Sequence, residues 1–126
     1  MLVDDNEVDN LINQKMIESN AIADHIYTHT GAKSALEFLR NMQKLKVASD
    51  VLPNIIFLDI DMPLMDGFQF LDEFAKLSPL TKKTCKIIML TSSNNPQDFD
   101  RSKKHPYVKL YLNKPLSQES IQKINV

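Results

Sequence analysis

The chain has 126 residues, of which 43% are hydrophobic and 25% are charged, the balance of an ordinary globular protein. This length fits one compact domain, so residues 1–126 are predicted to fold as a single unit. The net charge of -1 gives no reason to expect nucleic acid as a direct partner. No apolar run approaches the roughly 20 residues of a membrane-spanning helix, and no signal-peptide layout opens the chain, so no membrane association is expected.

Cysteine and glycine are scarce, which removes further classes of function. Cys85 is the one cysteine, so no internal disulfide can form, and a reducing, cytoplasmic location is expected. The two glycines, Gly31 and Gly67, lie far apart. Phosphate-binding loops and dinucleotide-binding fingerprints both need clustered glycines, so P-loop nucleotide hydrolysis and Rossmann dehydrogenase chemistry are excluded.

The first half of the chain is predicted to alternate short strands with helices. Residues 1–4 indicate the end of a strand, and residues 6–19 carry apolar side chains at helical spacing. Residues 25–30 are β-branched and aromatic in content and predict a short strand. A helix then follows, and residues 44–54 form a polar connection. The apolar positions of the two helices are Val8, Leu11, Ile12 and Met16, and Ala32, Ala35, Leu36 and Leu39.

The middle of the chain contains two apolar runs. Residues 55–59, with the sequence IIFLD, and residues 86–91 are each typical of a strand buried on both faces. Asp66 and Gln69 have the spacing of a capping box, which predicts a helix after them. Residues 76–83 are interpreted as a solvated face. The expected stripe of this helix consists of Phe70, Leu71, Phe74 and Leu77.

The last part of the chain completes a repeating pattern. A short polar helix is predicted from Pro96, which suits a first helical turn. Residues 107–112 alternate apolar with more polar side chains, which predicts an edge strand with one wetter face. Ser117 is expected to cap a final helix. The order strand–helix, repeated five times, predicts an α/β fold in which helices cover both faces of a parallel sheet.

In such a fold, ligands bind beyond the carboxyl ends of the strands. The first and third strands end in Asp4, Asp5 and Asp59, and the fifth is followed by Lys114. Three carboxylates and one ammonium leave a net charge of about -2, which a divalent cation would balance. The donors are all oxygens, which suit Mg²⁺ or Mn²⁺, and the lack of cysteine and histidine there argues against zinc.

A cation beside Asp59 would equip this carboxylate to receive a phosphoryl group. The metal and Lys114 would offset charge on the transferring group, and Asp59 would be the nucleophile. Thr91, at the end of the fourth strand, offers a hydroxyl donor. The phosphorylated product adds roughly -1.5 to -2 charges, which would draw Thr91 and Lys114 toward it.

The motifs LVDD, IIFLDIDMPLMDG, IIMLTSS and YLNKP, in this order, resemble the receiver domain of two-component response regulators over essentially the whole chain. The resemblance implies a flavodoxin-like (βα)5 fold of three layers, with a five-stranded sheet of order 2-1-3-4-5. It implies a stand-alone signalling receiver and not an enzyme, since such a domain takes part only in its own phosphoryl transfer and dephosphorylation.

The resemblance also implies roles for individual acids. Asp59 matches the phosphoacceptor of the family. Asp4 and Asp5 match the acidic pair that holds Mg²⁺. Asp61 falls where the family supplies a metal ligand through a backbone carbonyl.

Three further positions match the switch of the family. Thr91 corresponds to the switch hydroxyl, and Lys114 to the phosphate-contacting lysine, whose bond to Pro115 is usually cis. Tyr111 matches the aromatic residue whose rotamer reports phosphorylation. The implied donor is a histidine kinase or a histidine phosphotransfer protein. The implied output is contact with a protein target or a second copy, through the face of the fourth helix, fifth strand and last helix.

Two alternatives remain open. Haloacid dehalogenase-like phosphatases also use an Asp-x-Asp pair after an apolar strand, as Asp59 and Asp61 would form, followed by a hydroxyl residue and a lysine. They carry that pair on their first strand, whereas here an acidic pair comes earlier. The second alternative is a receiver-shaped interaction module that no longer accepts phosphate. Such modules usually lose the acceptor, the hydroxyl or the lysine, and this chain retains all three.

Overall fold

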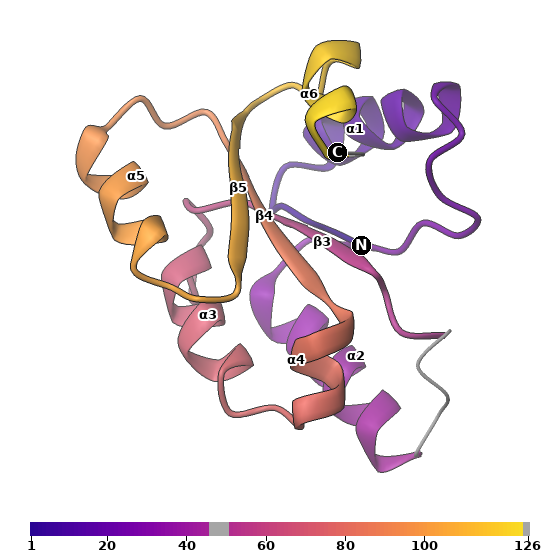
Figure 1. Cartoon of the computed structure of the whole chain (residues 1–126), viewed down its shortest axis with the longest axis vertical. Helices are drawn as coiled ribbons and strands as arrows, with labels where there is room; N and C mark the ends of the chain where they lie inside the picture. Colours follow the sequence, from indigo (N-terminus) through magenta and orange to yellow (C-terminus); the bar gives the residue numbers. More distant parts are fainter. Residues whose placement is uncertain (46–50, 125–126) are drawn as a thin grey trace.

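A five-stranded sheet with helices on both faces forms the molecule (Figure 1). The computed structural model describes residues 1–45 and 51–124. The strands lie in the order β2-β1-β3-β4-β5, and every neighbouring pair is parallel. The predicted fold class and the sheet order 2-1-3-4-5 are therefore confirmed.

The strands lie where the sequence places them, although the first two are short. The pairing of β1 with β2 joins Leu2 to Thr28 and Val3 to His29. Because β1 offers only two residues for pairing, β2 is shorter than the run 25–30 predicts. The strands are β1 Leu2–Val3, β2 Thr28–His29, β3 Ile55–Leu58, β4 Lys86–Thr91 and β5 Val108–Asn113.

The described residues form six helices, one more than the sequence predicts. The expected capping box is present, because Asp66 accepts from the Gln69 N–H and the Gln69 side chain accepts from the Asp66 N–H. The middle of the predicted polar connection, residues 46–50, lies outside the described residues. The helices are α1 Glu7–Ser19, α2 Ala32–Lys44, α3 Gly67–Phe74, α4 Pro79–Thr84, α5 Pro96–Lys103 and α6 Gln118–Ile124.

The extra helix is α4, which follows α3 after a short turn. Ser78 caps it by accepting a hydrogen bond from the Thr81 N–H at 3.3 Å, and Pro79 occupies its first turn. The interpretation of residues 76–83 as a solvated face holds in part: Lys76 and Lys83 are exposed, but Leu77 and Thr81 are buried, at 6% and 1% exposed. The fourth and last predicted helices are therefore α5 and α6.

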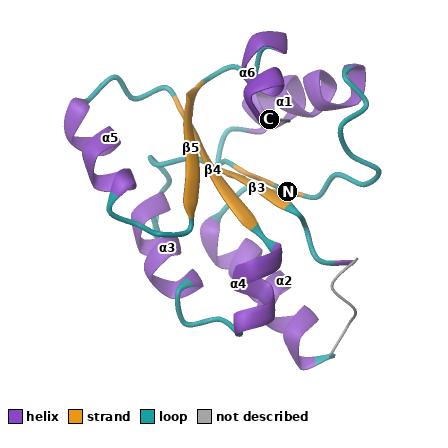
Figure 2. Ribbon diagram, viewed as in Figure 1, coloured by secondary structure: helices purple, strands orange, loops and turns teal. Residues whose placement is uncertain are grey.

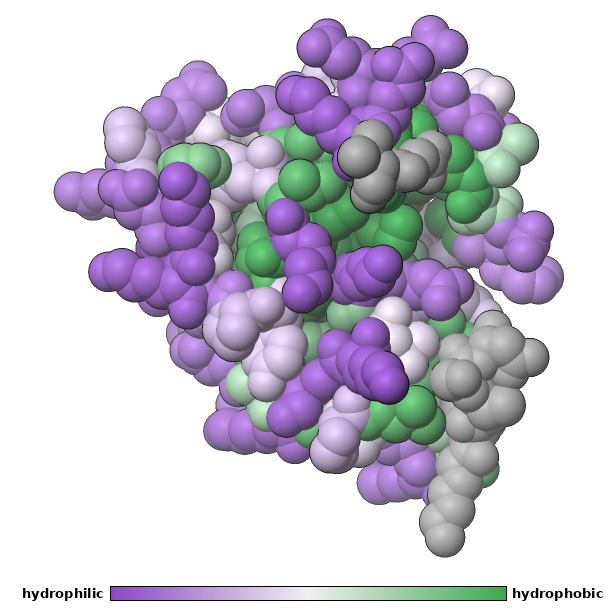
Figure 3. Space-filling model, viewed as in Figure 1, coloured by the Kyte–Doolittle hydropathy of each residue, from purple (hydrophilic) through white to green (hydrophobic). Residues whose placement is uncertain are grey.

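Apolar side chains pack on both faces of the sheet. One cluster joins α2 and α3 to the sheet through Leu36, Phe70 and Phe74, and a second joins α1 to it through Ile17 and Phe57. Figure 2 shows α1 and α6 together on one side of the strands, with α2 and α3 on the other. In Figure 3 hydrophobic residues gather toward the middle of the view, and hydrophilic ones form the outline. The buried strands and the two helical layers agree with the sequence analysis.

Helix α1 is present as predicted, but of its predicted apolar stripe only Met16 packs against the core. Two asparagines share the buried face of the helix with Ile17. Asn10 Nδ2 donates to the Asp4 carbonyl at 3.0 Å, and Asn13 Oδ1 accepts from the Leu116 N–H at 3.0 Å. These bonds compensate for the burial of polar side chains. The solvent-facing apolar residues are Val8, Leu11 and Ile12, which are 63%, 53% and 45% exposed.

Among residues 1–45 and 51–124, the structure contains no helix with the length and apolar character that crossing a membrane requires.

Candidate functional site

Three carboxylates meet at the carboxyl edge of the sheet. Asp4 follows β1 and Asp59 follows β3, and the Asp59 N–H donates to the Val3 carbonyl at 3.0 Å. One carboxylate oxygen each from Asp4, Asp5 and Asp59 lies within 4.8 Å of the others. Asp4 and Asp59 are 4% and 5% exposed, whereas Asp5 is open to solvent. The predicted convergence of these acids is confirmed.

Backbone N–H groups hold the two buried carboxylates in place. Asp4 Oδ1 accepts from the Asn6 N–H at 2.9 Å, and Asp59 Oδ1 accepts from the Ile60 N–H at 2.9 Å. Charged acceptors form stronger hydrogen bonds than neutral ones, so these bonds orient the carboxylates firmly.

Lys114 brings its ammonium into the same cluster from the far end of the chain. Its Nζ atom lies 2.6 Å from Asp4 Oδ2, 3.1 Å from Asp9 Oδ2 and 3.4 Å from Asp59 Oδ1. The Lys114 N–H donates to the Thr91 carbonyl at 2.9 Å, which fixes the backbone at the end of β5. The bond from Lys114 to Pro115 is cis, as the resemblance implies.

The ionisation of Asp59 reflects these surroundings. The pKa of Asp59 is raised to about 7. Burial is the largest cause and repulsion from Asp4 adds to it, while attraction by Lys114 opposes the rise. Burial by itself would lower the pKa of Lys114, but its bonds to Asp4 and its attraction to Asp59 raise that pKa above its usual range. Lys114 is therefore charged at neutral pH, whereas Asp59 exchanges its proton close to neutral pH.

Gly67, the first residue of α3, is required for the loop that carries Asp59. The Gly67 N–H donates to the Ile60 carbonyl at 2.8 Å. A Cβ atom at this position would collide with the backbone oxygen of Asp59. A side chain here would push the acceptor loop away from the helix.

The hydroxyl of Thr91 lies at the neighbouring strand end. Thr91 is fully buried, and its Oγ1 accepts from the Ser93 N–H at 3.1 Å. Ser93 Oγ in turn donates to Asp98 Oδ2 on α5 at 2.6 Å. The strand-end hydroxyl is thus linked to helix α5 by two hydrogen bonds.

Tyr111 and Asp61 lie around this site. Tyr111 packs partly buried against the core, with its ring edge-on to Phe99 at 5.3 Å between centroids. Its hydroxyl is buried and has no hydrogen-bond partner among the described residues. Asp61 is exposed in the bend after Asp59, and the three-carboxylate cluster is formed without its side chain.

Sequence reasoning missed Asp9, which contacts Lys114. Asp9 lies four residues after Asp5, in the first turn of α1. A helix that begins directly after a strand end keeps its first turn at the same rim as the acids. This position in the first turn is the signal that could have identified Asp9.

The donor set fits a divalent cation. Asp4, Asp5 and Asp59 offer carboxylate oxygens close enough to share one ion. Hard oxygen donors of this kind suit Mg²⁺ and Mn²⁺, which retain several water ligands.

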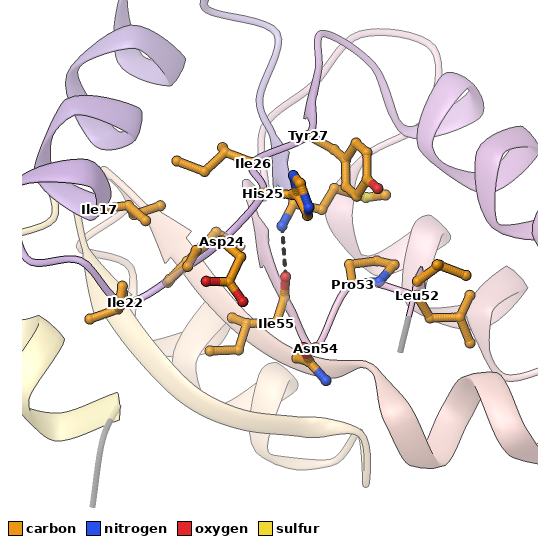
Figure 4. Close-up of a pocket in the computed structure, with 14 residues that line it drawn as sticks. Ile17, Ile22, Asp24, His25, Ile26, Tyr27, Leu52, Pro53, Asn54 and Ile55 are labelled. Atoms are coloured by element: carbon orange, nitrogen blue, oxygen red, sulfur yellow. Dashed lines mark hydrogen bonds between the residues drawn. The ribbon is translucent and has the colours of Figure 1, made fainter. Parts of the chain in front are cut away.

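A cavity of about 600 Å³ lies at the opposite, amino-terminal end of the strands (Figure 4). Ile17, Ile22, Ile55 and other residues line it, and the Met1 ammonium donates to the Ile55 carbonyl at 2.8 Å. It contains none of the acids or the lysine described above, so it is separate from the candidate site.

Comparisons with known proteins agree on one family. The family model "Response regulator receiver domain" matches residues 1–125. The two-component response regulator ORR1 of Oryza sativa subsp. japonica is 31% identical over 98% of this chain and 52% of its own length. The chain thus spans about half the length of that relative.

Solved structures share the fold. A two-component response regulator from Cytophaga hutchinsonii superposes with a TM-score of 0.87 at 25% identity, over 98% of this chain and 90% of that one. The Mn²⁺-bound form of response regulator Rcp1 superposes with a TM-score of 0.74 at 26% identity, over 98% and 85% of the two chains. Rcp1 belongs to Synechocystis sp..

The chain therefore belongs to the family of response regulator receiver domains, the signalling modules of two-component systems. This membership decides against the haloacid dehalogenase-like alternative. Receiver domains bind Mg²⁺ or Mn²⁺ at an acidic pocket, and they interact with histidine kinases or phosphotransfer proteins.

Proposed function

We propose that Asp59 accepts a phosphoryl group from the phosphohistidine of a histidine kinase or histidine phosphotransfer protein. Mg²⁺, or Mn²⁺ in its place, would be bound by Asp4, Asp5, Asp59 and the backbone carbonyl of Asp61. The observation that carries this proposal is the position of Asp59, which lies among two further carboxylates and 3.4 Å from the Lys114 ammonium.

The transfer is an in-line displacement at phosphorus. A carboxylate oxygen of Asp59 forms a bond to phosphorus while the bond from phosphorus to the donor imidazole nitrogen breaks, and that nitrogen keeps the electron pair. Lys114 donates to an oxygen of the transferring group and offsets its charge. When bound, the cation supplies further positive charge and favours the ionised form of Asp59.

The chain's own chemistry ends with loss of this group. A water oxygen forms a bond to phosphorus while the bond from phosphorus to the Asp59 oxygen breaks. This step releases inorganic phosphate and returns Asp59 to a free carboxylate, so the protein takes part in its own dephosphorylation. Asp61 and Ser93 flank the site and would set how long the phosphoryl group persists. Phosphoryl lifetimes of variants at these two positions test this assignment.

Signalling would begin at Thr91. Its hydroxyl moves toward the phosphoryl oxygens and leaves the Ser93 N–H, which disturbs the bond from Ser93 to Asp98 on α5. Tyr111, which packs against Phe99 of α5, changes its rotamer with the same movement. The face made by α5, β5 and α6 then changes shape and binds a protein target or a second copy. This is the α4-β5-α5 face in the family's own numbering of helices.

The donor protein would dock on α1. Its exposed apolar residues Val8, Leu11 and Ile12 lie on the helix that begins at the acidic rim, so a partner seated there is next to Asp59. We expect this transfer to take place in the cytoplasm, a location with which the free, buried Cys85 is consistent.

Labelling with a small phosphodonor tests the proposal. Incubation with acetyl phosphate and Mg²⁺ is expected to add about 80 Da, the mass of one phosphoryl group, to the parent protein. Asp59→Asn should take up no label, whereas Asp72→Asn, a change at an exposed acid of α3, should label normally. A parent protein that takes up no label would instead be a receiver-shaped interaction module. Sustained turnover of p-nitrophenyl phosphate would contradict a receiver function.

A further inference from the structure

We propose that Asp9 is a positioning residue for phosphoryl transfer: it holds the Lys114 ammonium so that one N–H group points at Asp59 and at the incoming phosphoryl group. This inference rests on the proposed function of Asp59. It assigns a role in the reaction to a residue outside the motifs that identify the family.

The geometry of the lysine carries the argument. An ammonium has three N–H donors, and Lys114 Nζ contacts three carboxylates. Two of them, Asp4 and Asp9, arrive from the end of β1 and from α1, so they restrain the ammonium from two elements. The third N–H is left for Asp59, and for a phosphoryl oxygen when Asp59 carries the group.

Asp9 differs from the other two partners of Lys114 in one respect. Asp4 and Asp59 belong to the three-carboxylate cluster that fits a cation, and Asp9 does not. Asp4 and Asp59 would share their oxygens between Lys114 and a bound cation, whereas the carboxylate of Asp9 would remain with the lysine. Asp9 is therefore the partner that can keep Lys114 in place when the three-carboxylate cluster holds a cation.

The position of Asp9 is itself fixed by the fold. Its N–H donates to Asn6 Oδ1 at 3.1 Å, in the cap of α1. The adjacent Asn10 is buried and donates to the carbonyl of Asp4. The side chains of Asp9 and Lys114 are 34% and 11% exposed, so the pair is shielded in part from solvent. These contacts hold the first turn of α1 against the site. The pair of Asp9 and Lys114 is therefore better fixed than an ordinary surface ion pair.

Loss of Asp9 should therefore slow the reaction through Lys114. A lysine side chain has four rotatable bonds, and without Asp9 its ammonium samples positions away from Asp59. The initial rate of labelling by acetyl phosphate with Mg²⁺ measures this effect. We expect Asp9→Ala to reduce the rate roughly tenfold, since a small misplacement of a group that contacts the reacting atoms has effects of this order.

Three further variants separate positioning from charge. Asp9→Asn keeps an oxygen acceptor for Lys114 and should retain most of the parent rate. Glu7→Gln removes a charge from the same helical turn at an exposed position and should label like the parent. In a Lys114→Met background, Asp9→Ala should cause no further loss. If Asp9→Ala labels as fast as the parent, or faster because repulsion of phosphate is removed, the proposal is overturned.

A readout without phosphate distinguishes this failure from failure of the proposed function. In ¹⁵N-labelled, metal-free protein, the held ammonium of Lys114 should give a protected N–H signal in the parent and in Asp9→Asn. The signal should be lost in Asp9→Ala, and an unchanged signal would overturn the role of Asp9. If the parent shows the signal but takes up no label, the assignment of Asp59 has failed while the contact of Asp9 with Lys114 stands.

Discussion

At the scale of single residues, Asp59 lies in surroundings that work against its charge. Burial and the neighbouring Asp4 raise its pKa to about 7, from an ordinary value of 3.8. Between these values the folded state binds more protons than the unfolded state does. The free energy of unfolding of the metal-free protein is therefore reduced as the pH rises through this window.

This linkage predicts that Asp59→Asn increases the free energy of unfolding by an amount that depends on pH. An asparagine resembles the protonated carboxyl and removes the repulsion by Asp4. The free energy of unfolding of the variant should therefore equal that of the parent near pH 4 and exceed it above pH 7. We expect about 2 kcal/mol of extra stability at pH 8 for loss of one buried, incompletely compensated charge. Urea unfolding with a chelator present, at both pH values, measures the difference.

Asp72→Asn is the matched control, because it removes an exposed carboxylate elsewhere in the fold. A stability difference between parent and Asp59→Asn that is the same at pH 4 and pH 8 would contradict the raised pKa of Asp59.

The identities of the acids could be predicted from their positions after apolar runs. The first turn of α1 could have placed Asp9 at the same rim, but its contact with Lys114 could not be predicted. Asp4, Asp5 and Asp59 end strands, and strand ends of a parallel sheet share one edge. The position of Asp9 depends on the rotation of α1, and that rotation is set by Asn10 and Asn13. Two asparagines facing the sheet are not visible in a pattern of apolar residues.

At the scale of elements, the turn from β3 into α3 fixes the geometry of the acceptor. Gly67 lies against the backbone of Asp59, where a Cβ atom cannot fit. This close contact needs glycine for its lack of a side chain, because the backbone angle at Gly67 is one that other residues adopt.

Gly67→Ala should therefore destabilise the protein by about 2 kcal/mol, the usual cost of forcing a methyl group against backbone. It should also lower labelling of Asp59, because the acceptor loop must shift. Denaturant unfolding and labelling by acetyl phosphate measure the two effects. Gly31→Ala is the matched control, since a Cβ atom there meets nothing within 4 Å. Equal stability of the two variants would contradict the account of this turn.

The elements themselves follow from the sequence in most places. Runs such as residues 86–91 contain enough β-branched and aliphatic side chains to specify a buried strand, and β4 has these bounds. Helix α4 was missed because its residues look polar, although Ser78 and Pro79 together signal a new helix start. The short β2 was overestimated because strand length depends on the partner strand.

At the scale of the whole molecule, the sheet order joins parts of the chain that are far apart. Placing β1 between β2 and β3 sets Asp4 beside Asp59, and β5 returns Lys114 to the same edge. Local patterns do not determine the order of strands, and only the resemblance supplied it. Once the order is known, the convergence of acids and lysine follows from topology.

A cation that bridges these distant segments should stabilise the whole fold. By mass action, Mg²⁺ at 100 times its dissociation constant adds about 2.7 kcal/mol to the free energy of unfolding. The melting temperature should rise with Mg²⁺ in the parent and in Asp72→Asn, and rise much less in Asp5→Asn. An Asp5→Asn protein with the full response to Mg²⁺ would show that the cation binds elsewhere.

The central claim is that Asp59 takes up a phosphoryl group with the help of a cation held at this edge. The most direct measurement is to map the modified residue by peptide mass spectrometry after incubation with acetyl phosphate, with Mg²⁺ and with a chelator. The account predicts modification of Asp59 alone, and only with Mg²⁺ present. Modification of another residue, or of Asp59 to the same extent in the presence of chelator, would contradict it.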